Sequence, residues 1–282
     1  MIINTHQQAL EIVYLLNHTP LMTRHIGLLP GMDVPRIAQI QHILEIGSGP
    51  GGWTREAART YPNKQITGID SHPAMISYAH TLSQRQGLTN VHHVAIPHLR
   101  GPFLAWPNAS FDLISARSLS KMVQPCDWSS LLAECWRLLR PGGWMGLTEF
   151  EMGLSNSPAH EEVVALFYRA MSKTGRSFSP TERHLGVLCE LEPLMSEARF
   201  EQINIVSHTL NYSYGTEFYR EWMMDFQCLC ELIFPLIVST GVATQEDLNG
   251  LSLQLKREMR LPVFHACLQG VTVWGTTGDA SV

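Results

Sequence analysis

Gly47, Gly49 and Gly52 follow a short apolar run and have the spacing G-x-G-x-x-G within the stretch EIGSGPGGW. This spacing after a strand gives a tight turn, which lets a ligand approach the backbone at a helix N-terminus. Asp70 ends the next apolar run, 18 residues after Gly52, where an acid can hold two ribose hydroxyls. The pattern therefore predicts a site for an adenosine cofactor, which is either a dinucleotide or a different adenosine ligand.

Glu45 lies two residues before Gly47 and distinguishes between these two ligands. A carboxylate at this position would repel a pyrophosphate, whereas it would attract ammonium and sulfonium groups. The first strand also follows a helical N-terminal segment, whereas dinucleotide domains often begin with that strand. Both observations favour a positively charged adenosine ligand, and a dehydrogenase that uses NAD is the less favoured alternative.

The elements that position these residues alternate between strand and helix patterns along the first half of the chain. Strands are predicted at 42–47, 65–70, 91–96, 111–116 and 143–151, and helices at 52–61, 73–86 and 128–140. Short connections between such elements indicate parallel strands with helices on both faces. The fold class is therefore α/β, a Rossmann-like doubly wound seven-stranded mostly parallel sheet with an N-terminal helical segment and an inserted helical cap.

After residue 151 the predicted helices become longer. They are expected at 158–174, 181–198 and most of 215–260, with strands at 200–212 and 266–277. Before the sheet, a helix is expected over 5–18, and Pro20, Pro30 and Pro35 should then break the chain into short pieces. We divide the chain into an N-terminal helical lid segment (1–40), a cofactor-binding core (41–212 and 263–282) and a helical cap over the substrate site (213–262).

The chain resembles the class I S-adenosylmethionine-dependent methyltransferases, in particular the broad group that acts on small molecules. The resemblance lies in LEIGSGPGGW, ITGIDSHPAMI, SFDLI and LLRPGG, which occur in this order between about residues 42 and 150. It implies S-adenosyl-L-methionine as the cofactor and S-adenosyl-L-homocysteine as its product. A single motif of this kind is weak, whereas four in register are specific.

The resemblance also implies roles for individual residues. Glu45, Gly47, Ser48 and Gly49 should hold the methionine end, Asp70 both ribose hydroxyls, and Ser71 and Met75 the adenosine. Arg117 lies where the family contacts the methionine moiety or the acceptor. The family usually has an acid after the third strand for the adenine amine, but VAIPHLRGPF (94–103) contains none. Backbone groups near Ala95, Ile96 and Pro97 are the expected substitute.

A hydroxyl or amine acceptor must lose a proton, and Glu149 and His18 are the candidate bases. Tyr14, Tyr212 and Tyr214 are the candidate contacts for an apolar or aromatic acceptor. We expect in-line methyl transfer to an oxygen, nitrogen or carbon atom of a small molecule under a helical lid. A protein that binds the cofactor without transferring methyl, or a rearrangement catalyst on this fold, is the other alternative.

Composition limits the other function classes. The net charge of −5 and the absence of a basic run argue against nucleic-acid binding. The six cysteines form no C-x-x-C pair, so neither a disulfide framework nor a metal site is expected. No basic leader and no apolar run of membrane-spanning length occur, so a cytoplasmic protein without membrane contact is expected. The low charged fraction of 16% is compatible with a homo-oligomer.

Overall fold

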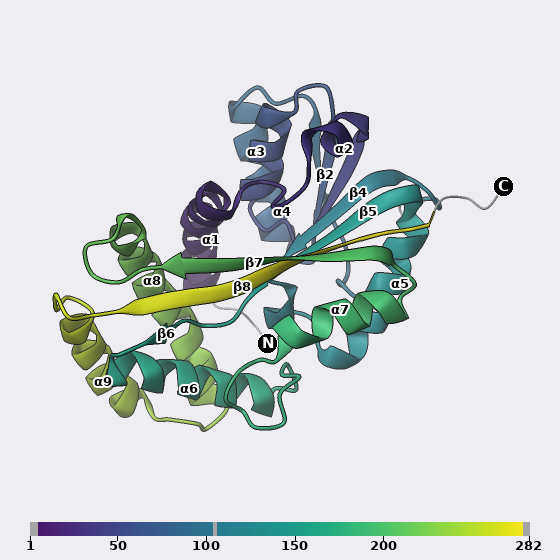
Figure 1. The fold of residues 1–282 in the computed structure, drawn as a ribbon. Coiled ribbons are helices and arrows are strands. Elements are labelled where there is room, and N and C mark those ends of the chain that lie inside the picture. Colours follow the sequence, from purple (N-terminus) through teal and green to yellow (C-terminus); the bar gives the residue numbers. More distant parts are fainter. Residues whose placement is uncertain (1–4, 104–105, 279–282) are drawn as a thin grey trace.

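The computed structural model describes residues 5–103 and 106–278, in which one twisted sheet carries helices on both faces (Figure 1). Within these residues the strand order is β3-β2-β1-β4-β5-β8-β6, and β7 pairs with β8. The strands are β1 His42–Ile46, β2 Gln65–Asp70, β3 Val91–Ala95, β4 Phe111–Arg117, β5 Leu139–Phe150, β6 Leu154–Ser155, β7 Glu201–Asn211 and β8 Ala266–Thr276. β1 to β5 are parallel, and the last three strands pair antiparallel. The predicted α/β class is confirmed, with eight strands in place of seven because the two-residue β6 leaves no pattern in the sequence.

The helices that cover the sheet alternate with its strands. They are α1 Thr5–Ile26, α2 Val34–Gln39, α3 Gly52–Thr60, α4 Pro73–Arg85, α5 Trp128–Leu138, α6 Pro158–Lys173, α7 Val187–Glu197, α8 Glu217–Ser239 and α9 Gln245–Glu258. Short 3₁₀ turns occur at Leu119–Lys121 and Pro125–Asp127. In Figure 1, α3 and α4 lie on one side of the parallel strands, and α5 and α7 lie on the other.

Alternate residues of the central strands point to two separate apolar clusters. Ile43 and Leu113 pack with Trp53 of α3, whereas Leu44 and Ile114 belong to the larger cluster that contains Leu131 of α5. Successive side chains of a strand point to opposite faces, so a strand covered on both sides is apolar throughout. This is why the parallel strands were recognisable in the sequence as short continuous apolar runs.

Three local predictions were wrong. α1 continues through Pro20 to Ile26, because burial of Leu21 and Met22 offsets the hydrogen bond that proline removes. The helix expected from residue 181 begins at Val187, since Gly186 takes a left-handed conformation with φ +78°. The LRPGG stretch was expected to turn the chain before a strand at 143, but it already forms the start of β5.

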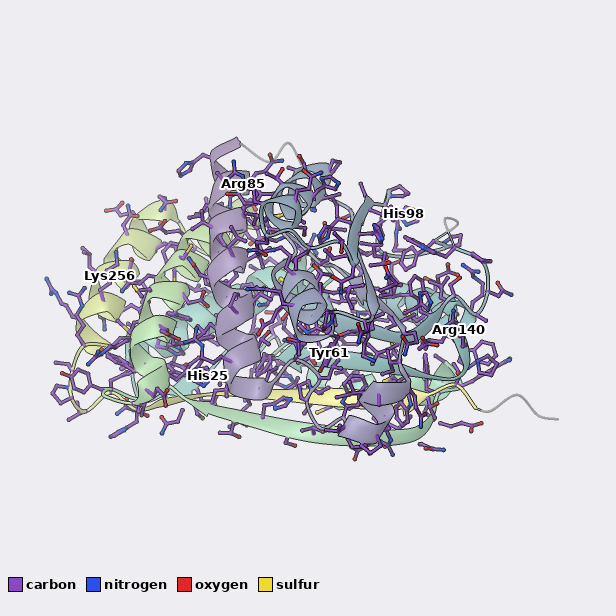
Figure 2. All side chains as sticks on the ribbon, turned by 90° about the horizontal axis from the view of Figure 1, so that it is seen from above. His25, Tyr61, Arg85, His98, Arg140 and Lys256 are labelled. Carbon is purple, nitrogen blue, oxygen red and sulfur yellow. The ribbon has the colours of Figure 1, made fainter. Side chains whose placement is uncertain are left out.

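α1 and the helices after β5 surround the end of the sheet at which the parallel strands stop. α8 and α9 lie between β7 and β8 in the chain, and these two long strands carry them past the parallel strands (Figure 1). α1 packs against both α8 and α3, and Figure 2 shows it lying between the cap helices and the parallel half of the molecule. The N-terminal helix therefore joins the two halves.

α8 is a described helix that is long and apolar enough to cross a membrane, with a mean hydropathy of 1.4. Half of that apolar window is buried inside the protein, and the buried side chains include Trp222, Phe226 and Ile233. A helix that is apolar on most sides is expected where several elements pack around it. The expectation of no membrane contact stays a prediction.

Gly146→Ala tests the packing between β5 and β8, and Gly250→Ala in α9 is its control. A Cβ at Gly146 would overlap the ring of Trp274, whose indole nitrogen donates to the Pro30 carbonyl at 2.6 Å. We expect Gly146→Ala to lower the free energy of unfolding by about 1–3 kcal/mol, because the ring cannot move aside. Gly250 in α9 has open space around it, so its alanine variant should gain up to about 1 kcal/mol. Urea unfolding measures both, and equal effects would contradict this packing.

Candidate functional site

The turn between β1 and α3 requires residues without a side chain. Gly47, Gly49 and Gly51 have φ values of +71°, +51° and +75°, and residues other than glycine rarely adopt this conformation. A Cβ at Gly51 would lie 2.9 Å from both Ala79 and His93. The spacing had selected Gly52 as the third glycine, but the residue in the left-handed conformation is Gly51, the N-cap of α3.

Asp70 lies directly beneath this turn, at the end of β2, and is 3% exposed. One carboxylate oxygen accepts from the Gly49 N–H at 2.9 Å, and the other accepts from the His72 N–H at 2.8 Å. Each oxygen of a carboxylate keeps a second lone pair after accepting one such bond. Asp70 therefore fixes the turn and can still accept two hydroxyl groups. Ser71, next in the chain, is half-buried, and Met75 is buried in the first turn of α4.

Buried polar atoms without partners surround the glycine turn. Among the described residues they include Glu45 Oε2, Ser48 Oγ, Thr54 Oγ1 and Arg117 Nε. Burial raises the pKa of the Glu45 carboxyl well above its ordinary value, and the nearby Arg117 opposes this shift while Asp70 adds to it. Buried polar groups are normally hydrogen-bonded. Their number here indicates a ligand that carries its own polar groups, as the amino-acid end of S-adenosylmethionine does.

Arg117 ties the turn to the end of α1. Its guanidinium donates to Thr23 Oγ1 at 3.1 Å and to the Gly27 and Leu28 carbonyls at 3.0 and 2.5 Å. Burial lowers the pKa of this guanidinium to about 10, and the carboxyl of Glu45 works against that shift. A cation is favoured at a helix C-terminus, where the carbonyls have no partner in the helix. The sequence did not reveal this anchoring contact.

α1 covers the glycine turn from above. Leu15 Cδ1 would lie 3.2 Å from a Cβ at Gly49, and Thr19 Cβ 2.9 Å from one at Gly52. Leu119 and Met122 lie equally close to Gly47 from the other side. The residues at the turn thus fit the polar groups of the cofactor, while α1 closes the space above them.

The segment expected to replace the missing adenine-binding acid follows β3. Ala95 and Pro97 are exposed, and Ile96 is buried. The Ile96 N–H donates to the Asp70 carbonyl at 2.9 Å, so this donor already belongs to the sheet. The other backbone groups of the segment stay candidates for adenine recognition.

Residues 43–143 of the chain match a family model described as a methyltransferase domain. Methyltransferase str2 of Strobilurus tenacellus is 30% identical over 141 residues, which are 48% of this chain and 46% of that protein. A sterol 24-C-methyltransferase of Gibberella zeae is 28% identical over 137 residues, 48% of this chain and 32% of that protein. The chain thus matches less than half the length of these two curated relatives.

A solved structure extends the likeness beyond the family model. Phosphoethanolamine N-methyltransferase 2 of Haemonchus contortus, in complex with S-adenosyl-L-methionine, superimposes with a TM-score of 0.52 at 15% identity. The superposition covers 95% of this chain and 57% of that one. The matched residues 43–143 contain the glycine turn and Asp70. Residues 43–143 thus form a methyltransferase domain.

Glu149 lies one residue before the end of β5 and is 1% exposed. Its two carboxylate oxygens accept from Ser120 N–H at 3.1 Å and Ser120 Oγ at 2.6 Å. Burial raises the pKa of Glu149 to about 7, although both bonds to Ser120 oppose the shift. Through these bonds Glu149 holds the 3₁₀ turn after β4. Its role as a base stays a prediction.

His18 faces α8. Its Nδ1 lies 2.6 Å from Asp225 Oδ2, and its ring stacks on Tyr14 with 4.9 Å between centroids. Asp225 was missed in the sequence, although it is the lone acid within the apolar stretch WMMDFQCLC (222–230). A histidine held by a carboxylate through one ring nitrogen can accept a proton at the other. His18 and Tyr14 are thus brought together, with a partner from α8.

The two candidate tyrosines Tyr212 and Tyr214 lie between β7 and α8. Tyr212 is fully buried, donates or accepts a hydrogen bond at His160 Nε2 (2.9 Å), and packs against Trp222 at 5.3 Å. Tyr214 is 45% exposed and packs on Tyr219. Their roles toward an acceptor stay predictions, with Tyr212 serving the packing of Trp222.

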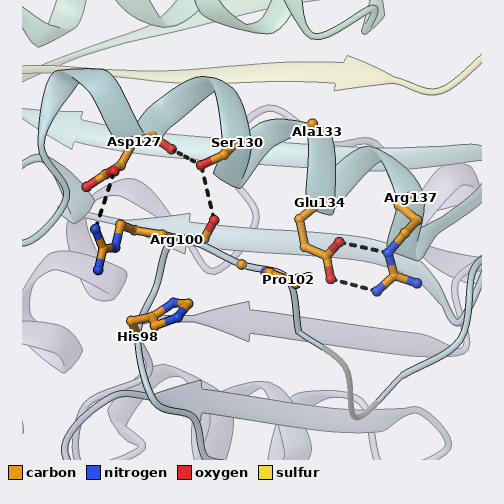
Figure 3. A pocket seen from close by; sticks show the side chains of 9 residues that line it. His98, Arg100, Pro102, Asp127, Ser130, Ala133, Glu134 and Arg137 are labelled. Atoms are coloured by element: carbon orange, nitrogen blue, oxygen red, sulfur yellow. Dashed lines mark hydrogen bonds and ion pairs between the residues drawn. The ribbon is translucent and has the colours of Figure 1, made fainter.

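A cavity of about 610 Å³ lies away from the glycine turn, between the loop after β3 and α5 (Figure 3). Glu134 pairs with Arg137 at 2.6 Å, and Arg100 lies 3.9 Å from Asp127. Figure 3 shows these pairs along its wall. Because these charges neutralise one another, we assign no chemistry to this cavity.

Glu149→Gln tests the burial of this carboxyl. Its pKa is raised from 4.5 to about 7, so the folded state binds the proton more tightly than the unfolded state. The stability contributed by the proton is complete below pH 4.5 and is lost as the pH rises through about 7. The free energy of unfolding of wild type minus that of Glu149→Gln should therefore fall by about 3 kcal/mol over this range.

Urea unfolding at several pH values measures this difference. Glu246→Gln, on the exposed surface of α9, is the matched control and should give a curve parallel to wild type. If the curve of Glu149→Gln also runs parallel to that of wild type, the raised pKa of Glu149 is contradicted.

Proposed function

We propose that this protein transfers the methyl group of S-adenosylmethionine to an apolar or aromatic small molecule. The observation that carries the proposal is the left-handed glycine turn over Asp70, flanked by the buried and unpartnered Glu45 and Ser48. The methyltransferase domain over residues 43–143 supports it, as do the names of the two relatives and the S-adenosylmethionine bound in the Haemonchus contortus enzyme.

The cofactor is assigned along the carboxyl ends of β1 and β2. Asp70 accepts the ribose hydroxyls with its remaining lone pairs, and Ser71, Met75 and the backbone of residues 95–97 line the adenosine. The methionine end meets the groups that are buried without partners, together with the turn itself: Glu45, Gly47, Ser48, Gly49 and Arg117 Nε. When bound, the cofactor supplies a methyl group already activated by its sulfonium charge.

The protein's own part is alignment and exclusion of water, because an in-line displacement at an activated methyl needs little else. α1 covers the turn with Leu15 and Thr19. The acceptor is assigned to the adjacent face of α1, where Tyr14 and His18 meet the aromatic side chains of α8. Such a lining favours a flat apolar acceptor.

Loading of the cofactor requires α1 to move. Glu11 of α1 lies close enough to Asp70 and His72 for both to act on its pKa, which burial raises. Gly27, just after the helix, has φ +89° and open space around it, so the chain can bend there. A cytoplasmic location, a homo-oligomer and the absence of nucleic-acid and membrane partners stay predictions.

Calorimetric titration of S-adenosylmethionine and of NAD into wild type and Asp70→Ala tests the cofactor assignment. We expect wild type to bind S-adenosylmethionine and not NAD, and Asp70→Ala to bind it at least about tenfold more weakly, because two charge-assisted hydrogen bonds are lost. Asp33→Ala, an exposed acid that caps α2, should bind as wild type does.

Binding of NAD in place of S-adenosylmethionine would favour the dehydrogenase alternative. Binding of S-adenosylmethionine without formation of S-adenosylhomocysteine from any phenol, amine or activated carbon acceptor would favour a protein that does not transfer methyl. Mass spectrometry of the cofactor product separates the two results.

A further inference from the structure

A buried polar cluster lies where α1 packs against α8. We call it the α1–α8 cluster, and it consists of Tyr14, His18, Trp222 and Asp225. Tyr14, Trp222 and Asp225 are 5%, 3% and 5% exposed. His18 lies at its centre, with Asp225 Oδ2 2.6 Å from its Nδ1, the Tyr14 ring at 4.9 Å and the Trp222 ring at 6.2 Å.

Three polar atoms of the cluster are buried without a hydrogen-bond partner among the described residues. They are Tyr14 Oη, Trp222 Nε1 and Asp225 Oδ1. The indole N–H can only donate, the phenol can donate or accept, and the carboxylate oxygen accepts. Buried groups of these types normally have partners, so their gathering around one histidine points to a polar group of a ligand.

We propose that the α1–α8 cluster binds the hydroxyl group of the acceptor and that His18 removes its proton, which makes this protein an O-methyltransferase for phenols or similar apolar hydroxyl compounds. The inference rests on the proposed function and names the acceptor class of the same site. Asp225 is a positioning residue, because it acts on the acceptor through His18.

The two unpartnered donors favour oxygen over nitrogen. A neutral amine has a single lone pair, which it must use to attack the methyl carbon, so it cannot also accept from Tyr14 and Trp222. A deprotonated hydroxyl keeps lone pairs for both donors while one pair attacks. Burial raises the pKa of Tyr14 well above its ordinary value, and Asp225 adds to the shift. The Tyr14 phenol therefore stays protonated and can act as a donor.

The proton and electrons can be followed through the step. The acceptor O–H gives its proton to Nε2 of His18, while Nδ1 keeps its hydrogen toward Asp225 Oδ2. The freed oxygen pair forms the O–C bond, and the electrons of the breaking C–S bond return to the cofactor sulfur. The imidazolium that forms is then stabilised by the Asp225 carboxylate.

Other charged groups around the cluster come from the turn after β4 and from α8. Lys121 lies in the fields of Asp225, Glu149 and Glu151, and burial lowers the pKa of its ammonium. Cys228 and Cys230 of α8 lie close enough to Tyr14 to add to the rise in its pKa. The cluster therefore has one histidine and one carboxylate at its centre, with a lysine beyond the carboxylate.

α1 places the cluster beside the glycine turn. Tyr14 and His18 each precede a residue that contacts the turn, namely Leu15 against Gly49 and Thr19 against Gly52. The same two helical turns thus present one face to the cofactor and an adjacent face to α8. Outside the cluster, Arg24 and Glu221 also join the two helices, with 2.7 Å between Nη1 and Oε1. This ion pair is on the exposed surface, so water can replace it when an acceptor enters between α1 and α8.

Absorbance titration of 4-nitrophenol tests the proposal, because its phenolate is yellow and its phenol is colourless. The probe is added to the full chain with and without S-adenosylhomocysteine at one pH, and 4-nitroaniline is the matched amine. We expect the phenolate-to-phenol ratio of the bound probe to be at least about tenfold higher in wild type than in His18→Gln. The aniline should bind wild type at least about tenfold more weakly than the phenol, because it cannot satisfy the two donors.

The variants separate a chemical role from a structural one. Asp225→Asn should lower the phenolate ratio nearly as far as His18→Gln does, and Tyr14→Phe and Trp222→Phe should each lower it in part. Glu221→Gln removes an exposed contact between the same two helices, and it should leave the ratio unchanged. Circular dichroism confirms that each variant is folded before the titration.

Equal ratios in wild type and His18→Gln would overturn the inference, as would tight binding of 4-nitroaniline or no binding of 4-nitrophenol to wild type. Titration of S-adenosylmethionine into His18→Gln keeps the two proposals apart. Unchanged cofactor binding there, with a lost phenolate signal, supports both proposals. Failure of wild type to bind S-adenosylmethionine would refute the proposed function whatever the probe shows.

Discussion

Burial of charged side chains at the carboxyl ends of the parallel strands is the constraint on which the rest of the structure depends. Arg117 ends β4, and Glu45 and Glu149 lie one residue before the ends of β1 and β5. Their apolar surroundings disfavour the charged forms of all three. The fold compensates in different ways. Arg117 donates from its two terminal nitrogens to the end of α1, and Glu149 accepts from Ser120. Glu45 Oε2 and Arg117 Nε stay without a partner.

α1 connects this strand edge to the cap. Its end is held by Arg117, its middle lies on the glycine turn, and His18 pairs with Asp225 of α8. A movement of α1 that admits the cofactor therefore also changes the surface offered to the acceptor. In the proposed reaction both substrates contact this one helix, so α1 would help to exclude water from both of them.

The parts that the sequence predicted well are local in the chain. The glycine turn, Asp70 and the five parallel strands depend on residues a few positions apart, whose spacing is visible directly. The contact between His18 and Asp225 joins residues 207 positions apart, and no spacing rule predicts such a pair. Pro20 inside α1 was misjudged for the same reason, because the packing that compensates it comes from distant elements. Gly51 lay one position from the glycine selected, where spacing alone cannot tell which residue takes the left-handed conformation.

A crystal structure of the protein with S-adenosylhomocysteine would test the central claim most directly. The account predicts both ribose hydroxyls on Asp70, the amino-acid end against Glu45, Ser48 or Arg117 Nε, and Leu15 displaced from Gly49. A ligand bound instead in the cavity beside α5, with Asp70 still bonded to Gly49 and His72 alone, would contradict it.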